Sequence, residues 1–536
     1  MNFLTVSNLH ELGGITMGEI NLVAPAQYNI TQEVEKFSHL DTRDAIRWLN
    51  DSGDRQNISY KQLVEKMNQY ANALTQAGLQ AGDRMLVIIP RLPEAYFIFL
   101  GALKAGIVPI SCSEMLRAKD LQYRMEHSDA SGIVSYHQFT DEVDKIDSDV
   151  AAMKIKLIIG DPKANWLSLN EQALTQSTSF EAAPTKSSDM AFLAYTSGTT
   201  GNPKAAVHSH SWGYAHVRTA ATSWLCVREG DLVWATAAPG WQKWIWSPFL
   251  STIMLGATAF VYHGGFDVTK YLTLLQDEKI NVLCCTPTEY RIMAKVDDLG
   301  QYDLSHLRSA VSAGEPLNRP VIETFQKLFN LKVRDGYGQT ENTLLVGTLE
   351  DTELRPGSMG VPTPGNRVCI INSEGNETAV GEIGDIAVHR STPALFKEYY
   401  RDPERTQAAF RGDWYITGDQ AYRDEDGYFW FEGRGDDIII SSGYTIGPFE
   451  VEDALNKHAA VQECAVVAAP DEIRGNIVKA FVVLRDGFTQ SDDLAKELQE
   501  HVKALTAPYK YPRSLVFLEE LPKTTSGKIR RVELRS

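Results

Sequence analysis

The sequence has few cysteines, and none of them form a metal-binding pattern. Six cysteines are spread over 536 residues, and no two have the two-residue spacing of a zinc site. A chain of this length can build a hydrophobic core without cross-links, so a disulfide-stapled miniature fold is excluded. We therefore expect free thiols and a reducing compartment.

Export signals and long hydrophobic runs are also missing. The first residues, MNFLTVSNLHELGG, contain neither a basic segment followed by a long apolar one nor an Arg-rich amphipathic presequence. The longest apolar stretch, Phe249–Tyr262, is shorter than the roughly 20 residues needed to span a bilayer. These absences predict a cytoplasmic protein without a membrane span, in which this stretch is buried core.

An excess of positive charge is absent as well. The chain carries 52 Lys and Arg against 69 Asp and Glu, a formal net charge of -17. This is the wrong sign for a general partner of nucleic acids or anionic membranes. The apolar share of 43% and the charged share of 23% are typical of globular proteins. We expect about three or four domain-sized units, in which any anionic ligand is met by local cations.

From residue 60 onward, helical segments alternate with short apolar strands. YKQLVEKMNQYANALTQAG precedes RMLVIIP, and EAYFIFLGALKAG precedes IVPIS. This alternation is typical of parallel sheets covered by helices. Ligands of such sheets bind beyond the carboxyl ends of the strands. Four later strand ends are therefore candidate sites: AFLAYTS, DLVWATAA, INVLCCTP and LRSAVSAG.

The pattern changes after about residue 357. Short apolar segments between Gly and Asp-Gly turns, such as WYITGD and GYFWFEGR, predict a β-rich subdomain over residues 357–433. A compact α/β pattern then resumes. We expect an α/β protein with a large N-terminal domain of parallel sheets over residues 1–433, which includes the β-rich subdomain, and a small mobile C-terminal α/β domain over residues 434–536.

The segment from Tyr195 to Lys204, YTSGTTGNPK, has the composition of a phosphate-binding loop. Gly198 and Gly201 allow the backbone to approach a polyphosphate, while the hydroxyl groups and Lys204 supply donors and charge. It is not a Walker A loop, because Pro203 stands where that pattern requires glycine. A flexible surface turn is the alternative interpretation.

This segment resembles the signature loop of the adenylate-forming superfamily, which includes acyl-CoA synthetases, adenylation domains of peptide synthetases, and luciferases. The resemblance runs from about residue 30 to the C-terminus and is closest to the medium-chain acyl-CoA synthetases. Further segments that resemble family motifs follow in order: SAGEP at 312–316, DGYGQTE at 335–341, YITGD at 415–419, GRGDD at 433–437 and PKTTSGK at 522–528.

The resemblance implies an ATP site. The carboxylate of Asp419 suits ribose hydroxyls, the ring of Tyr337 suits adenine, and Thr196 and Glu341 would share Mg²⁺. A turn Asp, a core Tyr and a surface Glu are the structural alternatives. The nucleotide-binding residues implied are Thr196, Ser197, Gly198, Thr199, Thr200, Gly201, Lys204, Gly314, Glu315, Pro316, Asp335, Gly336, Tyr337, Gly338, Gln339, Thr340, Asp419, Arg434 and Lys528.

The implied reaction has two steps, formation of acyl-AMP with release of pyrophosphate and then transfer of the acyl group to coenzyme A. Lys528 would stabilise charge at the α-phosphate, with Lys204 and Glu341 as the other catalytic residues. Lys528 lies in a basic tail, because residues 503–536 carry eight Lys and Arg against three Glu. We expect cations of this tail to meet the anionic ligands, although a solvated tail is the alternative.

The resemblance also implies motion of the C-terminal domain between the two steps. Asp436, which follows Gly433 and Gly435 in GRGDD, would be the hinge. Ser442, Gly443 and Tyr444 would line the coenzyme A tunnel. Thr445 stands where medium-chain relatives carry Arg, so no phosphate-binding role is carried over to it.

Trp241, Trp244 and Gly338 are the predicted acyl pocket. In acetyl-specific relatives a bulky aromatic residue occupies the position of Gly338, so glycine predicts room for a longer or aromatic acyl chain. No Asp or Glu occurs between Leu232 and Phe266. This argues against an amino-acid substrate, whose ammonium group would need a carboxylate partner. Lys243 could meet a second carboxylate or lie on the surface.

We therefore expect an AMP-forming CoA ligase for a medium-chain fatty or related monocarboxylic acid. Three alternatives stay open: an acyl-AMP ligase that loads a carrier protein, a benzoate-type CoA ligase and, more remotely, a non-catalytic ATP-binding protein. The expected partners are ATP, coenzyme A and the acid, with no nucleic acid, and a homo-oligomer is left open.

Overall fold

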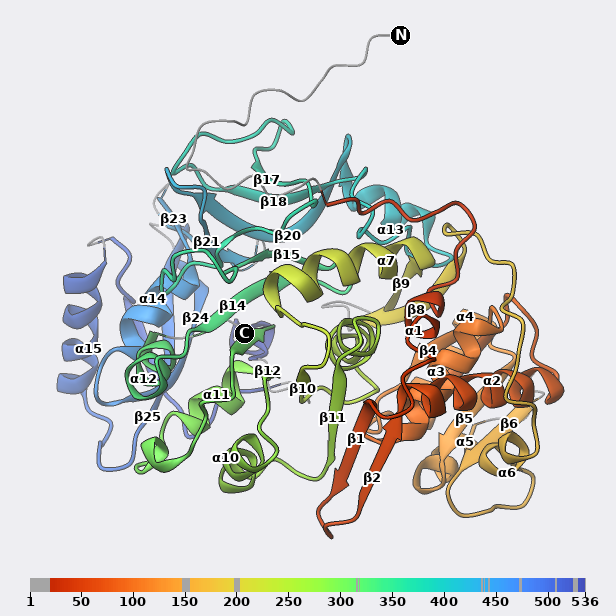
Figure 1. The fold of residues 1–536 in the computed structure, drawn as a ribbon. Coiled ribbons are helices and arrows are strands. Elements are labelled where there is room, and N and C mark those ends of the chain that lie inside the picture. The colour runs from red at the N-terminus through yellow and green to blue at the C-terminus, as the bar shows by residue number, and fades with distance from the viewer. Residues whose placement is uncertain are drawn as a thin grey trace.

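The computed structural model describes residues 20–146, 155–196, 203–314, 317, 319–434, 437, 439–441, 444–471, 475–506, 509–523 and 529–535. Parallel sheets with covering helices form the first part of the chain, an antiparallel sheet follows, and a smaller α/β unit ends it (Figure 1). This arrangement confirms the fold class expected from the sequence.

The first sheet contains five parallel strands in the order β4-β3-β5-β6-β7. Helix α2 begins at a capping box between Ser59 and Gln62, and buries Leu63, Met67 and Leu74 on one face. Helix α3 is buried along nearly its whole length. The elements are β3 (Arg84–Ile88), β4 (Val108–Ser111), β5 (Gly132–Tyr136), β6 (Ile155–Ile159), β7 (Leu167–Ser168), α2 (Tyr60–Gln76), α3 (Pro93–Lys104), α4 (Ala118–Ser128), α5 (Thr140–Asp144) and α6 (Leu169–Leu174).

The second sheet has nine strands in the order β16-β15-β14-β13-β12-β10-β11-β1-β2. Its six central strands are parallel, and the edge strands β2, β15 and β16 are antiparallel. The strands are β1 (Asp44–Asn50), β2 (Arg55–Ser59), β10 (Leu232–Ala235), β11 (Thr258–His263), β12 (Val282–Cys284), β13 (Ser309–Ala313), β14 (Val333–Gly338), β15 (Leu344–Gly347) and β16 (Val361–Pro362). The helices that accompany it are α7 (His210–Thr219), α10 (Val268–Asp277), α11 (Pro287–Met293) and α12 (Arg319–Phe329), with the π-helical turns η2 (Ala220–Trp224) and η3 (Ile245–Leu250).

One predicted strand end lies outside this sheet. AFLAYTS forms β8 (Met190–Thr196), which pairs with β9 (Lys204–Ser209) in a separate antiparallel hairpin. The other three predicted strand ends belong to β10, β12 and β13. An apolar run has the same appearance in a hairpin and in a buried parallel strand, so the sequence does not separate the two.

A third, antiparallel sheet contains β17 (Val368–Ile371), β18 (Gly384–His389), β19 (Phe410–Arg411), β20 (Trp414–Arg423) and β21 (Phe429–Arg434). The C-terminal unit follows, with its own core around Val451, Val466 and Leu498. Its elements are the hairpin β22 (Ile439–Ser441) and β23 (Tyr444–Ile446), the sheet β24 (Val461–Asp471), β25 (Gly475–Leu484) and β26 (Ser514–Phe517), and the helices α14 (Pro448–Asn456), α15 (Asp492–Leu505) and α16 (Arg531–Leu534). Short helical turns elsewhere are α1 (Gln32–Glu35), α8 (Gln242–Trp244), α9 (Ser251–Ile253), α13 (Pro403–Ala408), η1 (His137–Phe139) and η4 (Leu299–Gln301).

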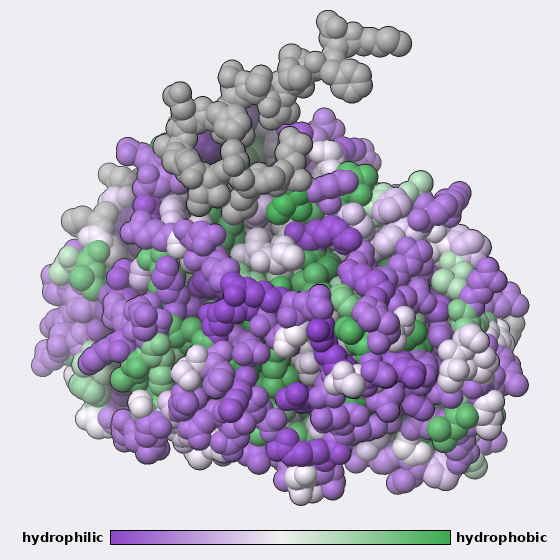
Figure 2. All heavy atoms as spheres, in the orientation of Figure 1, coloured by the Kyte–Doolittle hydropathy of each residue, from purple (hydrophilic) through white to green (hydrophobic). Residues whose placement is uncertain are grey.

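The surface is polar where it is in view. Figure 2 shows a mostly hydrophilic face with apolar side chains in small separate groups. Within the described ranges, no helix combines the length and the apolar character that crossing a membrane requires. The stretch Phe249–Tyr262 is core, as predicted, with Phe249, Leu250 and Phe260 buried.

Candidate active site

Lys204, Glu341 and Tyr399 form a hydrogen-bonded group at the base of the β8–β9 hairpin, called here the Lys204 cluster. Lys204 Nζ lies 2.7 Å from Glu341 Oε1 and donates to the Tyr399 hydroxyl at 2.5 Å. That hydroxyl donates to Glu341 Oε1 at 2.8 Å. Burial and the Glu341 carboxylate raise the pKa of Tyr399 well above its usual value, so the hydroxyl stays protonated. A cation and a carboxylate are thus held together where the glycine-rich loop ends.

Thr196 stands opposite Lys204 in the hairpin register. Its hydroxyl oxygen is buried and has no hydrogen-bond partner among the described residues. A buried hydroxyl without a partner is unusual, and it fits a ligand that supplies one. Within the described part of the chain, no group of three or more His, Cys, Asp or Glu could hold a metal by itself. Thr196 and Glu341 therefore fit Mg²⁺ that enters with a phosphate ligand. This ion typically binds only one or two protein oxygens, and phosphate oxygens and water supply the rest.

Asp419 is the centre of a second polar group, the Asp419 cluster. Its Oδ2 accepts hydrogen bonds from the Tyr337 hydroxyl at 2.5 Å and from Gln339 Nε2 at 2.7 Å. The amide of Gln339 is oriented by Tyr415, whose hydroxyl donates to Oε1, and by the Thr417 carbonyl, which accepts from Nε2. The carboxylate is buried, at 7% exposure. The cluster thus fixes one oxygen acceptor beside the carboxyl end of β14.

Asp419 lies within β20 and not in a turn. Gly418, with φ of 80°, and a register shift after Gln420 bend the strand locally. Arg434 pairs with Asp419 across β20 and β21, and its Nε lies 3.8 Å from Asp419 Oδ1. The Arg434 side chain is about half exposed. The structure thus brings together the carboxylate and the guanidinium that the sequence assigned to ribose and phosphate.

The ends of β13 and β14 lie side by side in the parallel sheet. Ala313 pairs with Gly336, so Gly314 and Tyr337 follow at neighbouring positions. Asp335 accepts hydrogen bonds from the backbone N–H groups of Leu317 and Gly336, which links the two strand ends. Burial raises the pKa of Asp335 to about 7, and these two hydrogen bonds oppose the rise. Thr340 lies between Gln339 of the Asp419 cluster and Glu341 of the Lys204 cluster.

Gly338 lies where two backbone segments come close together. A Cβ atom built at this glycine would lie 2.2 Å from the carbonyl oxygen of Thr343. Close backbone approach at the β14–β15 bulge is therefore a second physical reason for glycine here, and the predicted room for the acyl chain stays a prediction.

The two predicted pocket tryptophans lie in different environments. Trp244 is 2% exposed and packs against Tyr96, Phe99 and Phe249, and its predicted place in the acyl pocket stays a prediction. Trp241 is 36% exposed at the start of α8. The sequence GWQKWIW alone does not distinguish an indole that contacts a ligand from one that packs in the core. Trp246, in the same run, is buried with an indole N–H that has no partner among the described residues.

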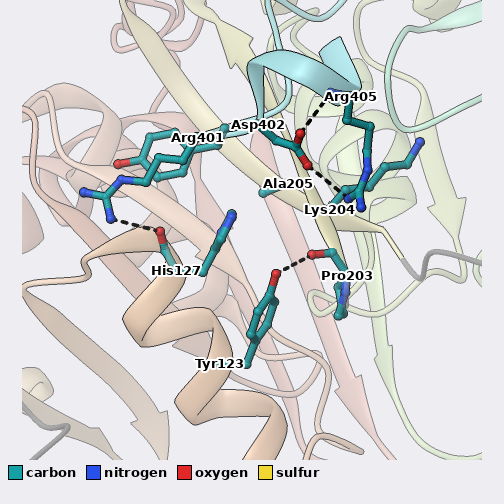
Figure 3. A pocket seen from close by; sticks show the side chains of 9 residues that line it. Tyr123, His127, Pro203, Lys204, Ala205, Arg401, Asp402 and Arg405 are labelled. Carbon is teal, nitrogen blue, oxygen red and sulfur yellow. Dashed lines mark hydrogen bonds and ion pairs between the residues drawn. The ribbon is translucent and has the colours of Figure 1, made fainter. Parts of the chain in front are cut away.

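A pocket with a volume of about 350 Å³ adjoins Pro203 and Lys204 (Figure 3). Tyr123 from α4 donates its hydroxyl to the Pro203 carbonyl, and Arg401 reaches the His127 carbonyl. The arginines of this pocket already have carboxylate partners: Arg401 pairs with Asp129, and Arg405 with Asp402. The nine lining residues are Tyr123, His127, Pro203, Lys204, Ala205, Tyr400, Arg401, Asp402 and Arg405.

Several predicted residues fall outside the described part of the structure, and their roles stay predictions. They are Ser197, Gly198, Thr199, Thr200, Gly201, Glu315, Pro316, Asp436, Ser442, Gly443 and Lys528. The backbone of Tyr444 lies in β23. Among the described residues, the sequence reasoning missed Tyr399. It stands in KEYYRDP, and only its neighbours in space, Lys204 and Glu341, distinguish it from a core tyrosine.

Comparison with known families accounts for most of the chain. Residues 37–400 match the family described as AMP-binding enzyme, and residues 450–528 match the AMP-binding enzyme C-terminal domain. The chain belongs to the AMP-binding enzyme family, which confirms the resemblance found in the sequence.

Two curated relatives cover nearly the same length. YtcI of Bacillus subtilis (strain 168), described as an uncharacterized acyl-CoA ligase, is 59% identical over 515 residues, which span 96% of this chain and 97% of YtcI. The mitochondrial acyl-coenzyme A synthetase ACSM3 of Homo sapiens is 39% identical over 532 residues, which span 96% of this chain and 91% of ACSM3.

Solved structures share the whole architecture. The anthranilate CoA ligase AuaEII, in complex with anthranoyl-AMP, has a TM-score of 0.87 at 29% identity and covers 95% of this chain and 97% of its own. A benzoate CoA ligase from Burkholderia xenovorans LB400 has a TM-score of 0.83 at 28% identity, with 95% and 100% covered.

Proposed function

We propose that this protein joins a monocarboxylic acid to coenzyme A through two half-reactions. The acid's carboxylate attacks the α-phosphate of ATP, which forms acyl-AMP and releases pyrophosphate. The thiol of coenzyme A then attacks the acyl carbonyl and releases AMP, and its proton passes to solvent. The relatives confirm the class, an AMP-forming CoA ligase. The observation that carries the assignment is the Lys204 cluster, which places a cation and a carboxylate beside Thr196 at the base of the glycine-rich loop.

The residues of the site act by positioning and by charge. Neither half-reaction needs a protein nucleophile, because the substrate carboxylate and the thiol of coenzyme A are the attacking groups. Lys204 would oppose the negative charge of the phosphates, and Glu341 and Thr196 would hold the magnesium that accompanies ATP. Magnesium, when bound, would supply further positive charge to the phosphate oxygens. Such charges are effective because they are fixed before the reaction begins.

The Asp419 cluster would hold the ribose. One carboxylate oxygen is fixed by Tyr337 and Gln339, and Arg434 faces the other across the strand pair. Gly314, Asp335, Gly336 and Tyr337 would surround the adenine at the two adjacent strand ends. Tyr337 would serve through its ring, while its hydroxyl positions Asp419.

The C-terminal domain would supply Lys528 for the first half-reaction and the segment around Ser442–Tyr444 for the second. This requires rotation about Asp436, with the domain boundary at Gly433. The resemblance to a family of two-step ligases supports this division. The cytoplasm is the proposed location, in keeping with six cysteines that form no disulfide.

The deciding test is a pyrophosphate-release assay with and without coenzyme A, on acids from acetate to dodecanoate plus benzoate. We expect release of pyrophosphate with the correct acid and an acyl-CoA product by mass spectrometry. Acyl-AMP formation without any thioester would assign the chain to carrier-protein loading, and no turnover with any acid would contradict the proposal.

A further inference from the structure

Lys243 holds a buried ammonium group between two indole rings. Its Nζ lies 4.8 Å from the ring centroid of Trp224 and 5.5 Å from that of Trp246, and it has no hydrogen-bond partner among the described residues. The faces of aromatic rings attract a cation, but they do not satisfy three N–H donors as oxygen atoms do. A buried ammonium group without an oxygen acceptor is costly to the fold. The sequence alternative of a surface lysine is therefore wrong.

A second hydrogen-bond donor lies near Lys243, and the chain segment around Lys243 contains no carboxylate. No Asp or Glu occurs between Leu232 and Phe266, and the indole N–H of Trp246 is also buried without a partner among the described residues. His216 contacts the Trp246 carbonyl at 3.0 Å, and burial lowers its pKa to about 3, so it is neutral. Lys243 and Trp246 thus present a charged donor and a neutral donor that a ligand with an acceptor oxygen could satisfy.

The indoles connect Lys243 to the proposed catalytic segment. Trp224 donates to the Asp335 carbonyl at 3.0 Å, and a Cβ atom at Gly336 would lie 2.6 Å from its ring. Through His216, Trp246 is linked to Thr343, whose hydroxyl lies 2.7 Å from His216 Nδ1. Residues 335–343 also carry Tyr337 and Gln339 of the Asp419 cluster and Glu341 of the Lys204 cluster.

The backbone at both indoles is unusual. Trp224 ends the π-helical turn η2, and Trp246 lies in the π-helical turn η3. π-Helical turns are rare in proteins, and those that occur are often found at functional sites. The extra residue changes the direction of the neighbouring side chains. Two of them hold the two rings that enclose one ammonium group.

We propose that Lys243, with the Trp246 N–H, recognises an acceptor oxygen on the acyl chain of the substrate. The substrate is then an acid whose chain bears a second carboxylate, a hydroxyl or a keto oxygen at the end opposite the activated carboxylate. This inference rests on the proposed function and narrows it, because an unsubstituted alkyl chain would leave both donors unmet.

The test compares acids of equal chain length with the purified full-length enzyme. Hexanoate is compared with adipate, 6-hydroxyhexanoate and 5-oxohexanoate, and the set is repeated at neighbouring chain lengths. The measured quantity is the ratio of kcat/KM for the oxygen-bearing acid to that for the plain acid, from thioester formation. We expect this ratio to fall at least ten-fold in Lys243→Met, which keeps a long side chain between the rings and removes the donors. Trp246→Phe should lower it by a smaller factor.

The matched control is Lys61→Met, which removes an exposed lysine on α2 and should leave the ratio unchanged. A ratio that Lys243→Met alters less than two-fold overturns the inference. If Lys243→Met does not fold, as judged by circular dichroism, Lys243→Gln replaces it under the same criterion. A drop confined to adipate identifies an anionic substituent, and a drop shared by all three identifies a general acceptor; both support the inference. Failure of the proposed function is distinct, because the wild-type enzyme would then activate none of these acids.

Discussion

Tyr399 links the two charged residues of the Lys204 cluster through one hydroxyl group. Its oxygen accepts from Lys204 and its proton is donated to Glu341. Phenylalanine at this position would keep the buried ring and remove both contacts. The ring therefore has a packing role and the hydroxyl a positioning role, and the two can be separated by substitution.

We predict that Tyr399→Phe lowers the rate of pyrophosphate release about ten-fold, because the two hydrogen bonds that position Lys204 and Glu341 are lost while both charges remain. Glu341→Gln should lower it by two orders of magnitude or more, since the carboxylate itself is removed. The check is steady-state pyrophosphate release over a magnesium titration. Equal losses in the two variants would contradict the distinction between a positioning and a catalytic residue.

The residues of the site were predictable from the sequence to different degrees. Lys204, Glu341 and Asp419 lie in dense motifs, where hydroxyls, glycines and charges cluster along the chain. Tyr399 comes from a segment without such a pattern, and only folding brings it within hydrogen-bond distance. For Trp244 the sequence left core packing and the acyl pocket both open, because an aromatic run looks the same in either environment.

At the scale of elements, backbone geometry at the β14–β15 bulge gives Gly338 a structural reason that is independent of the acyl pocket. The carbonyl oxygen of Thr343 occupies the space that a side chain at Gly338 would need in this backbone. The helices α2 and α3 were predicted well, since their segments have a clear apolar face or run. The β8–β9 pairing was not, because an apolar run has the same appearance in a hairpin and in a buried parallel strand.

We predict that Gly338→Ala destabilises the protein by about 2 kcal/mol or more, because strand β14 must shift to admit the methyl group. The control is Gly265→Ala, where a Cβ atom meets nothing within 4 Å, and it should change stability by less than about 0.5 kcal/mol. Urea unfolding measures both. A stable Gly338→Ala variant that accepts only shorter acids would contradict this prediction and support the predicted role of Gly338 in the acyl pocket.

At the scale of the whole molecule, the basic tail has a structural role that its charge did not indicate. Lys523 pairs with Glu463, Arg531 with Glu452, and Arg535 with Asp437, all within the region after Arg434. Lys510 likewise pairs with Glu450. These four cations therefore pair with carboxylates of the region after Arg434, and their expected contribution to binding anionic ligands stays a prediction. Lys528 lies outside the described residues and keeps its predicted role.

We predict that Lys528→Ala abolishes acyl-AMP formation and leaves thioester formation from supplied acyl-AMP largely intact. The proposed cation acts at the α-phosphorus, where bonds form and break in the first half-reaction. In the second half-reaction bonds form and break at the acyl carbonyl carbon instead. The two half-reactions are measured separately, by pyrophosphate release and by conversion of synthetic acyl-AMP. Equal loss of both would contradict a domain rotation that presents Lys528 only in the first.

Glu432 marks a contact between the large and small parts of the chain. A Cβ atom at Gly447 would lie 2.4 Å from its carboxylate. Burial, with Glu450 adding repulsion, raises the pKa of Glu432 from 4.5 to about 7, against the effect of Lys510. The folded protein then binds this proton more tightly than the unfolded chain. Its contribution to stability is therefore fully present below about pH 4.5 and is lost as the pH rises through about 7.

We predict that Glu432→Gln removes roughly 3 kcal/mol of the difference in unfolding free energy between pH 4.5 and pH 8. Urea unfolding at a series of pH values measures this difference. Glu181→Gln, at an exposed position, is the matched control and should retain the wild-type pH dependence. An unchanged slope in Glu432→Gln would show that the carboxyl is ionised throughout this range in the folded protein.

The ion pair between Lys204 and Glu341 has a consequence for the order in which ligands bind. Each charge is compensated by the other, so a ligand that takes only one of them leaves its partner buried and uncompensated. When a triphosphate pairs with Lys204, Glu341 loses its ion-pair partner and becomes available to a divalent cation. A divalent cation that binds Glu341 likewise makes Lys204 available to the triphosphate. Binding of the two should therefore be cooperative, and by thermodynamic reciprocity each should tighten the other by the same factor.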